Sequence, residues 1–188
     1  MKRHPLQSRF VLISGCSGGG KSTLLAELAG RGHPVVAEPG RRIIADELAS
    51  GGKALPWVDA AAFLGRAVDV ALQDVEMAKA HSGWVFFDRG LVDAASALEA
   101  LTGEPVLHPI CSAHRYHRHV FVTPPWPEIY VTDSERRHGF EMAVAEYQRL
   151  IETLPTLGYD VISLPKTSPT ERADFVLATL GGGAASVT

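Results

Sequence analysis

A glycine-rich stretch near the start of the chain combines the residue types that bind phosphate groups. Gly15, Gly20, Lys21 and Ser22 have the spacing G-x-x-x-x-G-K-[ST], between a short apolar run and an apolar helical pattern. Glycines let the backbone curl so that successive N–H groups point inward, and a helix that begins there adds free amides and its positive dipole end. The lysine reaches the terminal phosphates, and a hydroxyl ligates the magnesium ion that travels with them.

This pattern predicts that the chain binds a nucleoside triphosphate together with Mg²⁺. Lys21 is a candidate catalytic residue because it would hold the β- and γ-phosphates, and Ser22 is a candidate metal ligand. ATP is the default nucleotide and GTP the alternative, since the chain has no Asn-Lys-x-Asp guanine signature. A plain glycine-rich turn with a solvated lysine explains less, because the required strand and helix signals flank the loop. The expected phosphate contacts are Gly15, Cys16, Ser17, Gly18, Gly19, Gly20, Lys21, Ser22 and Thr23.

The rest of the chain alternates short apolar runs with longer helical patterns, which is typical of βαβ units and a parallel sheet. Amphipathic periodicity predicts helices over 64–78 and 140–154. Ser168 and Glu171 form a capping box that opens a last helix, which runs to Leu180. The expected strands lie at 10–14, 34–37, 84–88, 119–123 and 159–164.

With the phosphate loop after the first strand, this order of elements predicts an α/β, three-layer P-loop NTPase fold. By analogy with the P-loop kinase-like fold, we expect a five-stranded parallel sheet in the order 2-3-1-4-5, with helices on both faces. No linker or repeat interrupts the pattern, so residues 1–188 are expected to form a single kinase-like domain with a frayed tail at 181–188. In such sheets, ligands bind beyond the carboxyl ends of the strands.

Two of these strand ends place a carboxylate, and then a cation, beside the phosphate loop. Glu38 is followed by Arg41, and Asp88 by Arg89. Asp88 is the second candidate metal ligand, and both Glu38 and Asp88 are candidates for the base that takes the proton of an acceptor hydroxyl. Arg89 and Arg41 are candidates for holding anionic parts of a second substrate. The alternative is that Asp88 and Arg89 cap the next helix and pair with each other.

The segment after the fourth expected strand carries aromatic and basic residues. Trp126 and Tyr130 would either stack on a substrate ring or pack under a stiff, proline-rich loop. Arg136 and Arg137 are candidate catalytic residues that would close as a lid over the transferring phosphoryl group. The alternative places them in the first turn of the following helix, where the helix dipole disfavours arginine. Lys166, after the last expected strand, is a candidate contact to the nucleotide base.

Composition limits the class of protein and its partners. The chain has 188 residues, 46% of them hydrophobic, and a net charge of −3, which gives no general attraction to nucleic acid or anionic membranes. No stretch reaches the ~20 apolar residues of a membrane helix, and the N-terminal apolar run is too short for a secretion signal. Two cysteines argue against a disulfide framework, so a reduced, cytoplasmic protein is expected.

Two further groups of residues have a reactive or metal-binding chemistry. Cys16 lies in the phosphate loop, where the helix end is expected to lower its thiol pKa somewhat, and we assign it no catalytic part. Histidines crowd one region of the sequence, and we expect a solvated helix end there rather than a zinc site. They are His108, His114, His117 and His119.

The chain also resembles a known family in segments that follow the order of the expected strands. These segments are residues 13–23, 36–41, 85–93 and 124–130. Together they resemble a family of small AAA-like predicted ATPases, related to the nicotinamide riboside kinase domain, among the P-loop kinase-like NTPases. The resemblance implies a P-loop fold, ATP or GTP with Mg²⁺, and phosphoryl transfer to a small molecule. Glu38 is followed by Pro-Gly rather than by the tyrosine-alanine of riboside kinase relatives, which weakens the case for nicotinamide riboside as acceptor.

The leading hypothesis is therefore a Mg²⁺-dependent phosphotransferase that moves the γ-phosphate of ATP to a small nucleoside- or vitamin-like metabolite. The carboxylate–cation pairs beside the phosphate loop are more than simple hydrolysis requires. The alternative is a slow ATPase or GTPase that acts as a nucleotide-state switch with a protein partner. A nucleic-acid enzyme is disfavoured, because the sequence has neither a basic stripe nor an aromatic-basic platform. The sequence indicates neither the acceptor nor the oligomeric state.

Overall fold

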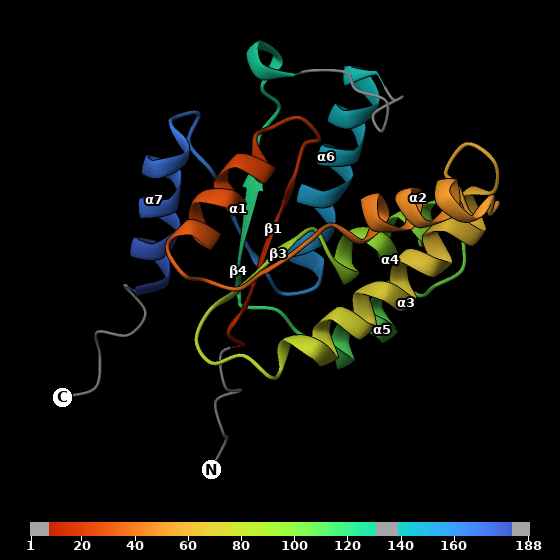
Figure 1. Cartoon of the computed structure of the whole chain (residues 1–188), viewed down its shortest axis with the longest axis horizontal. Helices are drawn as coiled ribbons and strands as arrows, with labels where there is room; N and C mark the ends of the chain where they lie inside the picture. The colour runs from red at the N-terminus through yellow and green to blue at the C-terminus, as the bar shows by residue number, and fades with distance from the viewer. Residues whose placement is uncertain (1–7, 131–138, 182–188) are drawn as a thin grey trace.

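Parallel strands run through the centre of the structure and form a five-stranded sheet in the order β2-β3-β1-β4-β5 (Figure 1). The computed structural model describes residues 8–130 and 139–181 of the chain. The sheet and its order confirm the prediction from the sequence. The outer strands β2 and β5 are each two residues shorter than expected, and β3 is one residue shorter. The strands are β1 (Phe10–Gly15), β2 (Val35–Val36), β3 (Val85–Asp88), β4 (His119–Thr123) and β5 (Asp160–Ser163).

The central strand β1 is buried along its whole length, which explains its continuous apolar run. Its side chains alternate between two cores, with Val11 and Ile13 on one face of the sheet and Leu12 on the other. At the carboxyl edge, Ile13 lies in register with Asp88 of β3, and Gly15 of β1 with Thr123 of β4. The chemistry-bearing ends of three strands therefore meet at one edge of the sheet.

Helices cover both faces of the sheet and complete the three layers (Figure 1). On one face, α1 (Lys21–Gly30) and α7 (Pro169–Gly181) pack against the sheet through a cluster that includes Leu24 and Val176. None of the described helices is both long and apolar enough to cross a membrane. The other helices are α2 (Pro39–Ser50), α3 (Ala60–Ala78), α4 (Leu91–Thr102), α5 (Leu107–Ala113), the short 3₁₀ helix η1 (Pro127–Ile129) and α6 (Phe140–Thr156).

The helices predicted from the sequence are confirmed, and the largest difference is the start of α3, which lies four residues earlier than expected. In the expected capping box at the start of α7, the Ser168 N–H donates to Glu171 Oε2 at 3.0 Å and the Glu171 N–H donates to Ser168 Oγ at 3.3 Å. Helix α3 begins before residue 64 because Asp59 caps it, accepting a hydrogen bond from the Ala62 N–H at 2.9 Å. This cap brings Phe63 into the helix, beside the functional site described below.

One histidine of the histidine-rich region departs from the expectation of a solvated helix end, whereas His108 on α5 is exposed as expected. His117 is buried, its ring lies edge-on to Trp84 at 5.3 Å, and its Nδ1 accepts a hydrogen bond from the His119 N–H at 3.1 Å. Burial lowers the pKa of His117. In the part of the chain that the structure describes, no group of three or more His, Cys, Asp or Glu side chains is arranged to hold a metal ion.

The close approach of β1 and β4 generates a first prediction. Gly15 has φ +108°, and a Cβ there would lie 2.5 Å from both N and O of Thr123. We expect Gly15→Ala to lower the free energy of unfolding by about 2 kcal/mol or more. Denaturant unfolding measures this change.

The matched control is Gly65→Ala in α3, where nothing lies within 4 Å of an added Cβ. This variant is expected to gain up to about 1 kcal/mol from the higher helix propensity of alanine. A Gly15→Ala variant as stable as the parent chain would contradict the register at this edge.

Candidate functional site

The loop between β1 and α1 is anchored to the end of β4. The Cys16 N–H donates to the Thr123 carbonyl at 2.8 Å, and Thr123 Oγ1 donates to the Cys16 carbonyl at 3.1 Å. Gly20 ends the loop in a left-handed conformation, with φ 79°, and is the N-cap residue of α1. The fold therefore supplies the curled backbone and the helix start that the motif predicts.

Lys21 is buried rather than solvated, with 7% of its surface exposed. Its Nζ donates to the Cys16 carbonyl at 3.0 Å. Burial, together with Arg89, lowers the pKa of Lys21 to about 8, against the opposing effect of nearby carboxylates. A bound polyphosphate would favour the charged amine, so this lysine is prepared for an anionic ligand.

A cavity of about 390 Å³ opens in front of this loop; we call it the phosphate cavity. Gly15, Cys16 and Gly19 of the expected phosphate contacts do not line it, whereas the other members of that set do. Lys166 is exposed and does not line it either, so its contact to the base stays a prediction. The lining residues are Ser17, Gly18, Gly20, Lys21, Ser22, Thr23, Glu38, Arg41, Asp88, Arg89, Trp126, Ile129, Thr167, Pro169 and Arg172.

Asp88 and Ser22 both line the phosphate cavity and fit a magnesium ion. Oxygen donors are what Mg²⁺ prefers, and it is usually held by one or two protein oxygens together with substrate phosphates. Asp88 Oδ1 is buried and has no hydrogen-bond partner among the described residues. Burial, and then the charge of Glu38, raises the pKa of Asp88 to about 6, although Lys21 and Arg89 act in the opposite direction. A bound cation would compensate this buried charge.

The backbone at Arg89 has an unusual conformation, which bears on where the side chains of Asp88 and Arg89 lie. Arg89 has φ 56°, the one positive φ of a non-glycine residue in the described chain, and its N–H donates to the Ile13 carbonyl at 2.9 Å. Such a conformation costs about 1 kcal/mol or more and persists where surrounding contacts hold it. Here the guanidinium binds Glu38 through Nε at 3.5 Å and Asp93 through Nη1 at 3.3 Å.

These contacts exclude the alternative in which Asp88 and Arg89 pair and cap the next helix. Asp93 takes that role, because its Oδ2 accepts a hydrogen bond from the Gly90 N–H at 3.1 Å and its Oδ1 from the Ser14 hydroxyl. Burial alone would lower the pKa of Arg89, but the surrounding carboxylates, Glu38 and Asp93 foremost, outweigh it and raise that pKa. Arg89 is therefore a permanent cation.

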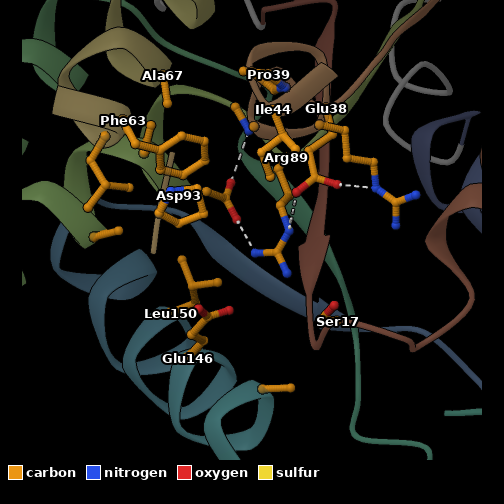
Figure 2. Close-up of a pocket in the computed structure, with 18 of the residues that line it drawn as sticks. Ser17, Glu38, Pro39, Ile44, Phe63, Ala67, Arg89, Asp93, Glu146 and Leu150 are labelled. Atoms are coloured by element: carbon orange, nitrogen blue, oxygen red, sulfur yellow. Dashed lines mark hydrogen bonds and ion pairs between the residues drawn. The ribbon is translucent and has the colours of Figure 1, made fainter. Parts of the chain in front are cut away.

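A second cavity of about 200 Å³ adjoins the first; we call it the side cavity (Figure 2). In Figure 2, Phe63 and Ala67 of α3 lie on one side, Leu150 and Glu146 of α6 on the other, and Arg89 reaches between Glu38 and Asp93. The remaining walls are largely apolar. The lining residues are Ser17, Glu38, Pro39, Gly40, Arg41, Ile44, Pro56, Phe63, Leu64, Ala67, Arg89, Gly90, Asp93, Ala94, Ala97, Tyr130, Ala143, Glu146, Arg149 and Leu150.

Ser17, Glu38, Arg41 and Arg89 line both cavities and form the boundary between them. Glu38 Oε2 accepts a hydrogen bond from Arg41 Nε at 3.0 Å, while its Oε1 faces Arg89. The two arginines thus hold one carboxylate at the point where the cavities meet. A group in the side cavity would face a phosphoryl group in the phosphate cavity across this boundary.

The remaining predicted residues are divided between the cavities or lie elsewhere. Trp126 lines the phosphate cavity, whereas Tyr130 lines the side cavity and packs edge-on against Phe140 at 5.1 Å. Their stacking on a substrate stays a prediction. Arg136 and Arg137, the expected lid residues, lie outside the described residues.

One expectation about the loop is wrong, because Cys16 is fully buried. Burial raises the pKa of its thiol, and the smaller effects of Lys21 and Arg89 in the other direction do not compensate. Desolvation therefore outweighs the helix end here.

Arg172 of α7 is a site residue that the sequence reasoning missed. It lines the phosphate cavity and donates to the carbonyls of Gly20 and Gly19. The available signal was its position in the apolar stripe of α7, four residues before Val176 and eight before Leu180. Glu146 and Arg149 of α6, which line the side cavity, carried no such signal.

Comparisons with known proteins agree with this geometry. A family described as an AAA domain matches residues 10–172 of the chain. A solved shikimate kinase from Acinetobacter baumannii, in complex with shikimate, is similar with 14% sequence identity and a TM-score of 0.61, over 94% of this chain and 95% of that one. A deoxyadenosine kinase from M. mycoides with bound dCTP is similar with 13% identity and a TM-score of 0.60, over 92% and 99% of the two chains. No curated protein matches in sequence.

The buried charge of Asp88 generates a prediction for the nucleotide-free protein. Because its pKa is raised from 3.8 to about 6, its ionised form destabilises the fold above pH 6 and not below pH 4. Asp88→Asn is therefore expected to raise the free energy of unfolding by about 2–3 kcal/mol at pH 8, a gain that disappears below about pH 4. Urea unfolding between pH 4 and pH 8 measures it.

The control is Asp69→Asn, which removes an exposed carboxylate of α3 and should leave the pH dependence unchanged. An Asp88→Asn variant that is less stable than the parent chain at pH 8 would contradict the assigned burial.

Proposed function

Because the chain belongs to the AAA domain family that matches residues 10–172, we propose that it is a Mg²⁺-dependent phosphotransferase that moves the γ-phosphate of ATP to a hydroxyl group of a small molecule. The observation that carries this proposal is the meeting of two cavities at Glu38, Arg41 and Arg89. Hydrolysis alone needs room for a water molecule beside the γ-phosphate. A second, largely apolar cavity with its own charged boundary is what an organic acceptor requires.

In this proposal the phosphate cavity holds the triphosphate. The loop amides and Lys21 bind the β- and γ-phosphates, and Ser22 and Asp88 hold the magnesium ion or its waters. The ion, when bound, neutralises charge that develops on the transferring phosphoryl group. Arg89, a permanent cation at the boundary, would stabilise the same charge from the side of the acceptor.

Glu38 is proposed as the base, with the acceptor oriented by the side cavity. Its carboxylate lines both cavities, whereas Asp88 lines only the phosphate cavity. It would take the proton of the attacking hydroxyl, a role that supports an alcohol rather than a phosphate as the acceptor. A phosphate acceptor would instead bring its negative charge against Glu38 and Asp93, which already share Arg89, while Arg41 is already bound to Glu38.

The walls of the side cavity support a small acceptor with an apolar or ring-shaped body. Ala67, Ala94, Ala97 and Ala143 leave a space between helices that larger side chains would fill. A nucleoside- or vitamin-like alcohol fits these properties. The names of the similar structures, a shikimate kinase and a deoxyadenosine kinase, support small-molecule acceptors for this fold in general.

The test is nucleotide turnover with Mg²⁺ and ATP, with and without a library of nucleosides, vitamins and cyclic alcohols. We expect one class of alcohol to raise turnover and to gain the mass of a phosphoryl group. Lys21→Met, which keeps a long apolar stem, should abolish this turnover. A slow rate that ignores every acceptor would contradict the proposal and favour the nucleotide-state switch.

A sharper prediction concerns Glu38. Because general-base catalysis is worth about 10²–10⁴-fold, Glu38→Gln is expected to lower kcat by at least about 100-fold while the KM for ATP changes by a few-fold. Steady-state kinetics with the acceptor identified above measures both quantities.

The matched control is Glu27→Gln on α1, which removes an ion pair with Arg31; neither residue lines a cavity, so this variant should leave kcat unchanged. If kcat is unchanged in the Glu38 variant, a group other than Glu38 accepts the proton of the acceptor hydroxyl.

A further inference from the structure

Arg172 is buried in an unusual way for an arginine. It is 2% exposed, its side-chain hydrogen bonds go to carbonyl groups, and it forms no ion pair with a carboxylate among the described residues. Arginine is almost never fully buried without a partner, because removing its charge from water is costly. Burial accordingly lowers the pKa of Arg172. A specific set of contacts must offset this cost.

Those contacts are backbone carbonyls of the phosphate loop. Arg172 Nη1 donates to the Gly20 carbonyl at 3.0 Å, and Nη2 donates to the Gly19 carbonyl at 3.1 Å. The planar guanidinium presents its donors in a fixed fork, so it can hold two successive carbonyls at once. It also packs closely on Gly20, where an added Cβ would lie 2.7 Å from Nη1.

This arrangement matters because amides and carbonyls alternate along a backbone. If the amides of the loop are to face a phosphate group, the carbonyls need partners on the other side. At the start of the loop, Lys21 and Thr123 already donate hydrogen bonds to the Cys16 carbonyl. At the end of the loop, where α1 begins, Arg172 donates to the carbonyls of Gly19 and Gly20.

Arg172 is itself fixed from α7 and from the segment after β4. The Arg172 N–H donates to the Ser168 carbonyl at 3.0 Å, inside the capped first turn of α7. Its guanidinium lies 5.9 Å from the centre of the Trp126 ring. Trp126, Thr167 and Pro169 line the same cavity, so the residue joins the walls of the phosphate cavity to the loop.

We propose that Arg172 is a positioning residue that holds the phosphate loop in its anion-binding shape through the carbonyls of Gly19 and Gly20. This inference rests on the proposed nucleotide binding. It assigns Arg172 to the polyphosphate and not to the base, because its two bonds go to the loop itself. Any ligand that uses the loop amides should therefore depend on it equally.

The experiment is calorimetric titration of Mg²⁺ with ATP, and of Mg²⁺ with inorganic tripolyphosphate, into Arg172→Gln and Arg172→Lys. Arg172→Gln is expected to lower the affinity for both ligands by the same factor, about 10- to 100-fold, as for a lost hydrogen bond to a charged group. Arg172→Lys keeps the charge but not the forked arrangement of donors. It should lower the affinity for both ligands equally, by a smaller factor than Arg172→Gln.

Arg31→Gln is the matched control. Arg31 also joins α1 to α7, through Asp174 at 2.6 Å and the Thr170 carbonyl at 3.1 Å, but it does not line the phosphate cavity. This variant should bind both ligands like the parent chain, even if its free energy of unfolding falls as much as that of the Arg172 variants. A purely structural role for Arg172 would not separate the two variants in this way.

The results that overturn the inference are distinct from those that overturn the proposed function. Loss of affinity for ATP alone, with tripolyphosphate unaffected, would make Arg172 a base contact. Unchanged affinities in Arg172→Lys would also overturn the inference if Arg172→Gln does not fold. If the parent chain binds ATP but phosphorylates no alcohol, the proposed function fails while the inference on Arg172 can still succeed. If the parent chain binds neither ligand, both fail.

Discussion

Three carbonyl groups of the loop between β1 and α1, those of Cys16, Gly19 and Gly20, have side-chain partners behind the loop, and the site depends on this constraint. A backbone can aim its amides at a cavity only if its carbonyls are satisfied elsewhere. Thr123 and Lys21 donate to the Cys16 carbonyl, and Arg172 donates to those of Gly19 and Gly20. The loop therefore has its binding conformation before a ligand arrives, so binding does not carry the entropic cost of ordering the loop.

The boundary between the cavities follows from a second constraint, the left-handed turn at Arg89. It leaves Asp88 in the phosphate cavity, while Arg89 reaches Glu38 and Asp93 at the boundary. Strained backbone and buried charge both reduce stability, and proteins retain them where function requires a fixed geometry. In our proposal this geometry keeps the base, the cation and the metal ligand in separate positions around one transferring group.

The sequence predicted the features that depend on local pattern, and missed those that depend on distant packing. A full motif between a strand and a helix was sufficient to predict the loop, and analogy with the P-loop kinase-like fold was sufficient to predict the sheet order. The side cavity was not predictable, because Ala67 and Ala143 look like ordinary core positions until their helices face each other. The contact of Arg172 with Gly20 joins residues 152 positions apart. At Cys16, burial raised the thiol pKa and outweighed the effect expected from the helix end.

The most direct test is a crystal structure of the chain with Mg²⁺ and a non-hydrolysable ATP analogue. We predict the triphosphate in the phosphate cavity, with its β- and γ-phosphates on the loop amides and Lys21, and the γ-phosphate facing Glu38 across the boundary. An analogue bound elsewhere, or a loop whose carbonyls have turned into the cavity, would contradict the account.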